Sequence, residues 1–207
     1  MATLSPDMVI YLTHPQVLID PDVPVPNWQL SVEGRQRVDA LADHISAADL
    51  GGAVAVVASA ERKAVETAAP LAAALGTRVD VRPGTHENDR SSTGFLAPPL
   101  FEAQADAFFA NPDRSMRGWE AASDAQARIL REVMAAEADH DGHALIICGH
   151  GAVGTLLYCA LAGLPISRQW DQLAGGGCWF AYSRKARRPL ARWAVMERLF
   201  AGEEIAR

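Results

Sequence analysis

The stretch Val9-Ile10-Tyr11-Leu12-Thr13-His14-Pro15 decides the fold of this chain and places its chemistry. Its first four residues are apolar and rich in β-formers, which predicts a buried strand. Pro15 cannot continue a hydrogen-bonded ladder, so the strand ends there and His14 lies at its carboxyl end. Ligands bind outside the carboxyl ends of strands in open α/β sheets, so we expect a site around His14.

A second apolar run ends in the same way. The run Ala144-Leu145-Ile146-Ile147-Cys148 is followed by Gly149-His150-Gly151, so another buried strand carries a histidine at its carboxyl end. The flanking glycines would let a ligand approach the backbone closely. We therefore expect His14 and His150 to lie along one rim of the same sheet.

Strands alternate with helices along most of the chain. This order predicts an α/β fold of three layers (α/β/α), with helices on both faces of a mainly parallel central sheet. The other strands are expected at 53–58 and 78–82, with a terminal pair around 178–182 and 190–196. Helices are expected after an N-cap at Ser31, after an N-cap at Ser59 up to Leu75, and over 101–109, 119–138 and 153–164.

The length favours a single domain. The chain has 207 residues and 49% hydrophobic content, which fits one domain over 1–207 better than two. Residues 90–118 are irregular apart from one short helix. An excursion of this size in a compact domain is usually a lid or a substrate-binding insert, and we interpret it so.

Composition excludes several classes of protein. A formal net charge of −6 and a pI near 5.5 argue against nucleic-acid binding. No apolar stretch reaches the roughly eighteen residues that a membrane span requires. The three cysteines lie in apolar surroundings without metal-ligand spacing, which is typical of free thiols in a reducing compartment. We expect a soluble cytoplasmic protein.

Four residues at strand or helix ends could share the site: His14, Arg62, Glu87 and His150. Two imidazoles and a guanidinium in one cleft favour an oxyanion, phosphate above all. A neutral imidazole can attack phosphorus, while a nearby carboxylic acid protonates the departing alkoxide. Because phosphoryl transfer depends on positioning and charge stabilisation, such a site needs no metal when enough cationic donors surround the phosphate.

Four motifs resemble those of the histidine phosphatase superfamily, which is also called phosphoglycerate mutase-like. Leu12-Thr13-His14-Pro15 stands where the family has Arg-His-Gly, and Ser59-Ala60-Glu61-Arg62-Lys63-Ala64-Val65-Glu66-Thr67-Ala68 is similar to its second signature. Thr85-His86-Glu87-Asn88-Asp89 resembles the family's acidic segment, and Cys148-Gly149-His150-Gly151 its second histidine motif. The motifs occur in the family's order and the resemblance covers nearly the whole chain.

The resemblance implies a phosphoglycerate mutase-like fold and a role for each motif residue. His14 would be the nucleophile that accepts the phosphoryl group, and Glu87 the proton donor. Arg62 and His150 would bind the phosphate and serve catalysis. The family uses no cofactor or metal for this chemistry.

The first motif departs from the family pattern. Thr13 replaces an arginine and Pro15 replaces a glycine, so the phosphate would lose a bidentate cation and a backbone N–H. The resemblance also places Thr13 and Gly151 at the phosphate. The Thr13 hydroxyl is a weaker donor than the guanidinium that the family has there. Loss of one such donor typically lowers the rate on the order of a hundred- to a thousandfold. Arg35, Arg82 and Arg90 are candidates for the replacement cation.

The sequence leaves three functions open. The first is a phosphomonoesterase that acts on a small-molecule phosphomonoester through a phosphohistidine at His14. The second is a degenerate member that binds a phosphorylated or anionic ligand without efficient turnover. The third is a phosphoglycerate mutase-like phosphotransferase. The sequence leaves the natural substrate and the oligomeric state open, with a homodimer as one option.

Overall fold

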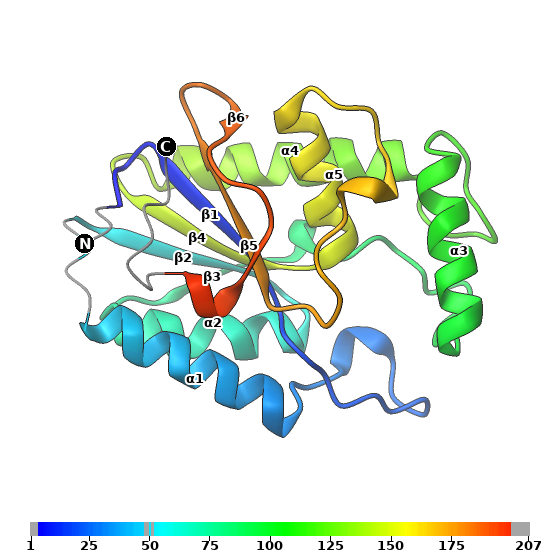
Figure 1. The fold of residues 1–207 in the computed structure, drawn as a ribbon, viewed down its shortest axis with the longest axis horizontal. Coiled ribbons are helices and arrows are strands. Elements are labelled where there is room, and N and C mark those ends of the chain that lie inside the picture. Colours follow the sequence, from blue (N-terminus) through cyan, green and yellow to red (C-terminus); the bar gives the residue numbers. More distant parts are fainter. Residues whose placement is uncertain (1–3, 48–49, 51, 200–207) are drawn as a thin grey trace.

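A central sheet with helices on both faces forms the protein (Figure 1). The computed structural model describes residues 4–47, 50 and 52–199. No helix within these residues is long and apolar enough to cross a membrane.

The sheet has the order β3-β2-β4-β1-β5-β6, and β7 pairs with β5. The four strands from β3 to β1 run parallel, whereas β5 is antiparallel to β1. The predicted α/β class with a mainly parallel sheet is therefore confirmed. The strands are β1 (Met8–Thr13), β2 (Val54–Ser59), β3 (Val79–Arg82), β4 (Ala144–Gly149), β5 (Cys178–Ser183), β6 (Arg188–Pro189) and β7 (Ala194–Val195).

The helices divide between the two faces and one end of the sheet. Helices α1 (Val32–Ala47) and α2 (Arg62–Ala74) pack on one face, and α4 (Ala122–Asp139) and α5 (Gly151–Ala162) on the other. Helix α3 (Pro98–Ala110) stands at one end of the molecule, within the 90–118 segment (Figure 1).

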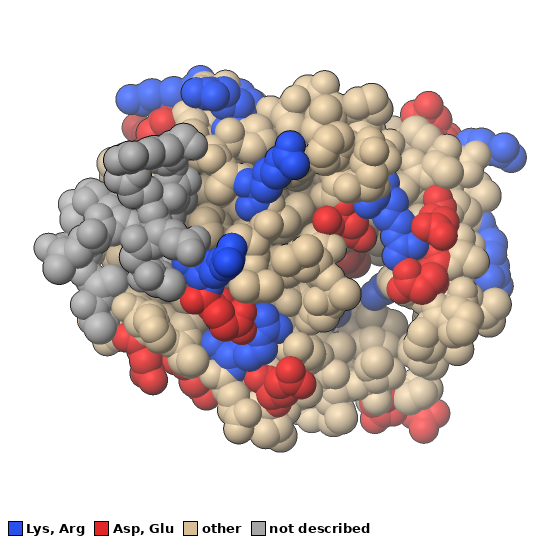
Figure 2. Space-filling view, viewed as in Figure 1, with Lys and Arg blue, Asp and Glu red and all other residues tan. Residues whose placement is uncertain are grey.

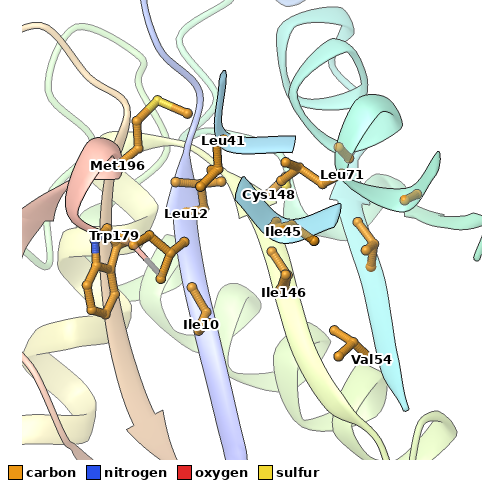
Figure 3. Packing of buried hydrophobic residues seen from close by; sticks show 14 of the residues in the cluster. Ile10, Leu12, Leu41, Ile45, Val54, Leu71, Ile146, Cys148, Trp179 and Met196 are labelled. Carbon is orange, nitrogen blue, oxygen red and sulfur yellow. The ribbon is translucent and has the colours of Figure 1, made fainter. Parts of the chain in front are cut away.

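Strand β1 contributes to the core on both of its faces. Ile10 and Leu12 pack with α1 and α2, whereas Val9 and Tyr11 pack with α4 and α5. Figure 3 shows Ile10 and Leu12 with their neighbours from β4 and α1. A central strand that is covered on both faces has no polar side to present, which explains its continuous apolar run.

Four helices begin at other residues than the sequence predicted. Helix α3 begins at Pro98, three residues before its predicted start, and α4 begins at Ala122, three residues after its predicted start. Ser59 is the last residue of β2, and Glu61 rather than Ser59 is the N-cap residue of α2. Helix α5 starts at Gly151, two residues early, so that His150 is its N-cap residue. The predicted cap at Ser31 is confirmed by the Gly34 N–H, which donates to the Ser31 hydroxyl over 3.0 Å. Helix ends depend on such local hydrogen bonds, which periodicity does not reveal.

The Tyr11 side chain accounts for the glycines at positions 149 and 154, which lie before and after His150 in the sequence. Its fully buried ring stacks on Phe180 at 5.5 Å between centroids. A Cβ atom on Gly149 would lie 2.3 Å from the Tyr11 Oη, and one on Gly154 would lie 2.5 Å from its Cε1. Strand β4 and helix α5 can therefore approach the ring only with glycine at these positions.

We predict that Gly154→Ala lowers the free energy of unfolding by about 1–3 kcal/mol, because the added methyl group overlaps a ring that cannot move. Denaturant unfolding measures the change. Gly52→Ala is the matched control, since a Cβ atom there would lie 3.7 Å from its nearest neighbour, in ordinary contact. Equal stability of the two variants would contradict this account of the packing.

Candidate active site

The structure brings His14 and His150 together at the carboxyl ends of β1 and β4. These strands are adjacent and parallel, with Thr13 opposite Gly149, and the His14 N–H donates to the Gly149 carbonyl over 3.1 Å. The two imidazole rings lie edge to face, 5.4 Å apart between centroids. Register between neighbouring strands thus places both histidines at one level of the sheet edge.

The His14 ring is held in one orientation. Its Nδ1 lies 2.9 Å from the Pro15 carbonyl oxygen. A carbonyl can only accept a hydrogen bond, so Nδ1 carries the proton and Nε2 keeps its lone pair. Burial and the charge of Lys63 lower the pKa of His14 from 6.5 to about 4, so the ring is neutral at neutral pH.

His150 is fully buried at the start of α5. The Tyr11 hydroxyl accepts the His150 backbone N–H over 3.1 Å and donates to its carbonyl over 3.2 Å. Neither ring nitrogen of His150 hydrogen-bonds to any residue that the structure describes. Burial lowers the pKa of His150 well below 6.5. Unpaired buried nitrogens are costly, so a ligand that supplied hydrogen bonds here would bind favourably.

The Glu87 carboxyl group lies against the N-terminus of α5. It accepts the N–H groups of Ala152 at 3.2 Å and Val153 at 3.0 Å. Burial raises the pKa of Glu87, although these hydrogen bonds and the charge of Arg90 oppose the change. A carboxyl group with a raised pKa holds its proton at a higher pH and is suited to act as an acid.

The structure places Arg62 outside this site. Its half-exposed side chain donates to the Glu66 carboxylate over 2.8 Å and to the side-chain amide oxygen of Gln29 over 2.7 Å. The predicted pocket role of Arg62 therefore needs correction. The cation that points inward at this place is the next residue, Lys63, whose side chain is only 3% exposed. Lys63 donates to the Val25 carbonyl over 2.9 Å and pairs with the Glu61 carboxylate.

Helical periodicity explains why Lys63 takes this place. Successive residues of a helix point about 100° apart, so adjacent side chains cannot share a direction. Lys63, Thr67 and Leu71 repeat every four residues and are all buried. That spacing was present in the sequence and could have identified Lys63 as the inward cation.

Glu61 is a site residue that sequence reasoning missed. One carboxylate oxygen accepts the Glu87 backbone N–H over 2.9 Å and lies 3.5 Å from the His150 Nε2. Burial opposes ionisation, but the electrostatic influence of His150 and Lys63 prevails and lowers the pKa of Glu61 to about 2. An ionised carboxylate therefore lies beside His150 at neutral pH.

The structure contradicts the phosphate contact predicted for Thr13. Its side chain is fully buried, and its hydroxyl accepts the Cys178 N–H over 2.9 Å and donates to the Gln172 side-chain oxygen over 2.5 Å. Thr13 therefore links β1 to β5. Gly151 lies close by, where a Cβ atom would come within 2.4 Å of the Gln172 Nε2. Its role toward a phosphate stays a prediction.

Of the three arginines proposed as a replacement cation, Arg90 is the one that lies at the site. Arg35 pairs with Glu66, and Arg82 pairs with Asp80 and Asp139. The Arg90 guanidinium lies 5.0 Å over the Phe101 ring and donates no hydrogen bond to any described residue. Its charge lowers the pKa values of His14 and Glu87.

A cavity of about 590 Å³ opens beside these residues. Glu61, Glu87 and Arg90 line it, together with the proline-rich loop 21–26. The Asn88 side-chain nitrogen is buried on its wall and finds no hydrogen-bond partner among the described residues. Figure 2 shows the surface hollowed beside the end of the molecule that carries α3, with charged side chains around the opening.

Within residues 4–47, 50 and 52–199, no group of three or more histidine, cysteine, aspartate or glutamate residues is arranged to hold a metal ion.

Comparison with known proteins identifies the family of this chain. The family model of the histidine phosphatase superfamily (branch 1) matches residues 21–193, a match that begins after His14. No curated protein matches the chain in sequence.

Solved structures share the fold. A mycobacterial glucosyl-3-phosphoglycerate phosphatase, in complex with inorganic phosphate, is 22% identical with a TM-score of 0.69, and the alignment covers 91% of this chain and 94% of that one. YhfR of Bacillus stearothermophilus is 18% identical with a TM-score of 0.73, over 89% of this chain and 94% of that one.

We predict that the His14 ring carries its proton on Nδ1 and titrates near pH 4. Two-dimensional ¹⁵N–¹H spectra of the imidazoles report both properties, and the signal that is lost in His14→Gln is assigned to His14. The unfolded chain binds this proton near pH 6.5, so the stability contributed by neutral His14 decreases as the pH falls from 6.5 to 4. A midpoint near 6.5, or a proton on Nε2, would contradict the assignment.

Proposed function

The chain belongs to the histidine phosphatase superfamily, and from this premise we propose that it is a phosphomonoesterase that uses His14 as its nucleophile. The observation that carries the proposal is the hydrogen bond from the His14 Nδ1 to the Pro15 carbonyl. This bond leaves the Nε2 lone pair free on a neutral ring, which is the form of imidazole that attacks phosphorus.

The reaction proceeds in two displacements. The His14 Nε2 forms a bond to phosphorus while the bond from phosphorus to the ester oxygen breaks, and the Glu87 carboxyl group gives its proton to the departing oxygen. Water then attacks the phosphohistidine, and the Glu87 carboxylate takes up a proton from that water. Inorganic phosphate leaves and His14 is restored.

Three groups supply positive charge or hydrogen-bond donors to the phosphate. The ammonium group of Lys63 lies in the buried network of Glu61, and the guanidinium of Arg90 lies at the cavity wall. His150 can take up a proton when a dianion approaches its unpaired ring nitrogens. These groups compensate in part for the arginine that Thr13 replaces, and the mechanism requires no metal.

A second function is favoured by the Glu61 carboxylate. This charge repels an anion next to His150 and neutralises Lys63, so the site holds less positive charge than a phosphate dianion demands. On this alternative, the protein binds a phosphorylated or anionic ligand with little turnover.

We predict that wild-type protein without added metal releases phosphate from small phosphomonoesters and that His14→Ala does not.

Lys63→Met should lower the rate of phosphate release on the order of 10²–10³-fold, because a buried cation near the transferred group is lost. Arg62→Ala is the matched control and should change the rate by no more than about twofold, since its exposed ion pair contributes little. A colorimetric phosphate assay measures all four proteins. Equal release by wild type and His14→Ala would reject the phosphohistidine mechanism.

We predict that Glu61→Gln tightens the binding of inorganic phosphate on the order of tenfold, because an ionised carboxylate beside His150 is removed. Isothermal titration calorimetry measures the dissociation constant. Glu66→Gln is the control, since that carboxylate pairs with Arg62 and Arg35 on the outer side of α2. Unchanged affinity in Glu61→Gln would contradict this electrostatic account. A wild-type protein that binds phosphate but releases no more of it than His14→Ala would favour the second function.

A further inference from the structure

A second cavity, of about 250 Å³, adjoins the one that contains Glu61 and Glu87. The two cavities share four lining residues, which are Val25, Arg90, Gly94 and Phe95. Glu61 lines the first cavity and lies 3.5 Å from the His150 Nε2, so a ligand held at the two histidines could extend through that cavity into this second space. It is smaller than the roughly 300–1,000 Å³ of pockets for drug-sized ligands, so it fits part of a ligand, such as a ring or a short alkyl group.

The walls of this second cavity are apolar. Among its lining residues only Arg90 and Glu102 are polar, and no hydroxyl or amide side chain is present. The apolar members are Ile19, Val25, Trp28, Phe95, Leu96, Pro98 and Phe101. We call this space the apolar subsite.

Two segments that are distant in sequence form the apolar subsite. Trp28 comes from the loop after β1, and its indole N–H donates to the Asp20 and Val23 carbonyls at 2.8 and 3.0 Å. Phe95 comes from the 90–118 segment and lies 5.8 Å from the Trp28 ring between centroids. The Trp28 indole is thus held in place by hydrogen bonds within its own loop, and Phe95 packs against it.

Arg90 lines both the apolar subsite and the larger cavity that contains Glu61 and Glu87. Its guanidinium lies over the Phe101 ring on one side, and its charge acts on His14 and Glu87 on the other. Because this cation donates no hydrogen bond to a described residue, it is free to contact an anion attached to an apolar group.

We propose that the apolar subsite binds the leaving group of the substrate, which makes the preferred substrates phosphomonoesters of aromatic or other compact hydrophobic alcohols. The proposal rests on the proposed phosphatase function. A sugar or glycerol group in the same space would find polar side chains only at Arg90 and Glu102, so most of its hydroxyls would be buried without a side-chain partner, which is costly. Burial of an aromatic ring against Trp28 and Phe95 is favourable.

The test compares 1-naphthyl phosphate with glycerol 2-phosphate. We expect kcat/KM to be at least about tenfold higher for 1-naphthyl phosphate. Phe95→Ala and Ile19→Ser should each remove most of this preference, measured as the ratio of the two kcat/KM values. Ile19 is 55% exposed, so its substitution does not endanger folding. Leu100→Ala is the control, because Leu100 is exposed in the same segment but does not line the apolar subsite.

A binding measurement separates this proposal from the phosphatase function. Titration calorimetry of His14→Ala with the same two esters should show tighter binding of 1-naphthyl phosphate, weakened again by Phe95→Ala in the same background. That result with no phosphate release from wild type would reject the phosphatase function and support the subsite. Similar kcat/KM and similar binding for both esters, unaffected by Phe95→Ala and Ile19→Ser, would overturn the subsite while leaving the phosphatase function intact.

Discussion

The parallel pairing of β1 with β4 is the constraint on which the rest of the structure depends. Thr13 lies opposite Gly149, so the next residue of each strand, His14 and His150, reaches the same level of the sheet edge. Tyr11 secures the arrangement, because its hydroxyl both donates to and accepts from the His150 backbone. Both strands are buried on both faces, so a slip by one residue would turn each side chain to the opposite face and separate the histidines.

A buried ion pair between Lys63 and Glu61 dominates the electrostatics of the site. Lys63 is almost completely buried and its ammonium group pairs with the Glu61 carboxylate. Glu61 also accepts the Glu87 N–H, so the same carboxylate fixes the segment that carries the candidate acid. The cost of this network is a negative charge beside His150. Arg90, on the cavity wall, is the nearby cation that opposes this charge on the proposed function.

The segment 90–118 extends the site beyond its histidines. It supplies Arg90 and Phe95 to the walls of both cavities. The loop after β1 faces it with Val25 and the fixed indole of Trp28. Two loops at the end of the sheet therefore shape both cavities, while the strands keep the histidines in place.

The sequence by itself determined the α/β fold, the strands that carry His14 and His150, and the position of Glu87, because apolar periodicity and chain-breaking residues act locally. The four-residue repeat of Lys63, Thr67 and Leu71 also indicates that Lys63 rather than Arg62 points inward from α2. That Glu61 lies beside His150, and that Arg90 rather than Arg35 or Arg82 reaches the site, follows only from the tertiary structure. Thr13 is bound by Cys178 and Gln172, more than 150 residues away. Contacts between residues far apart in sequence depend on packing between elements, and local sequence patterns do not specify that packing.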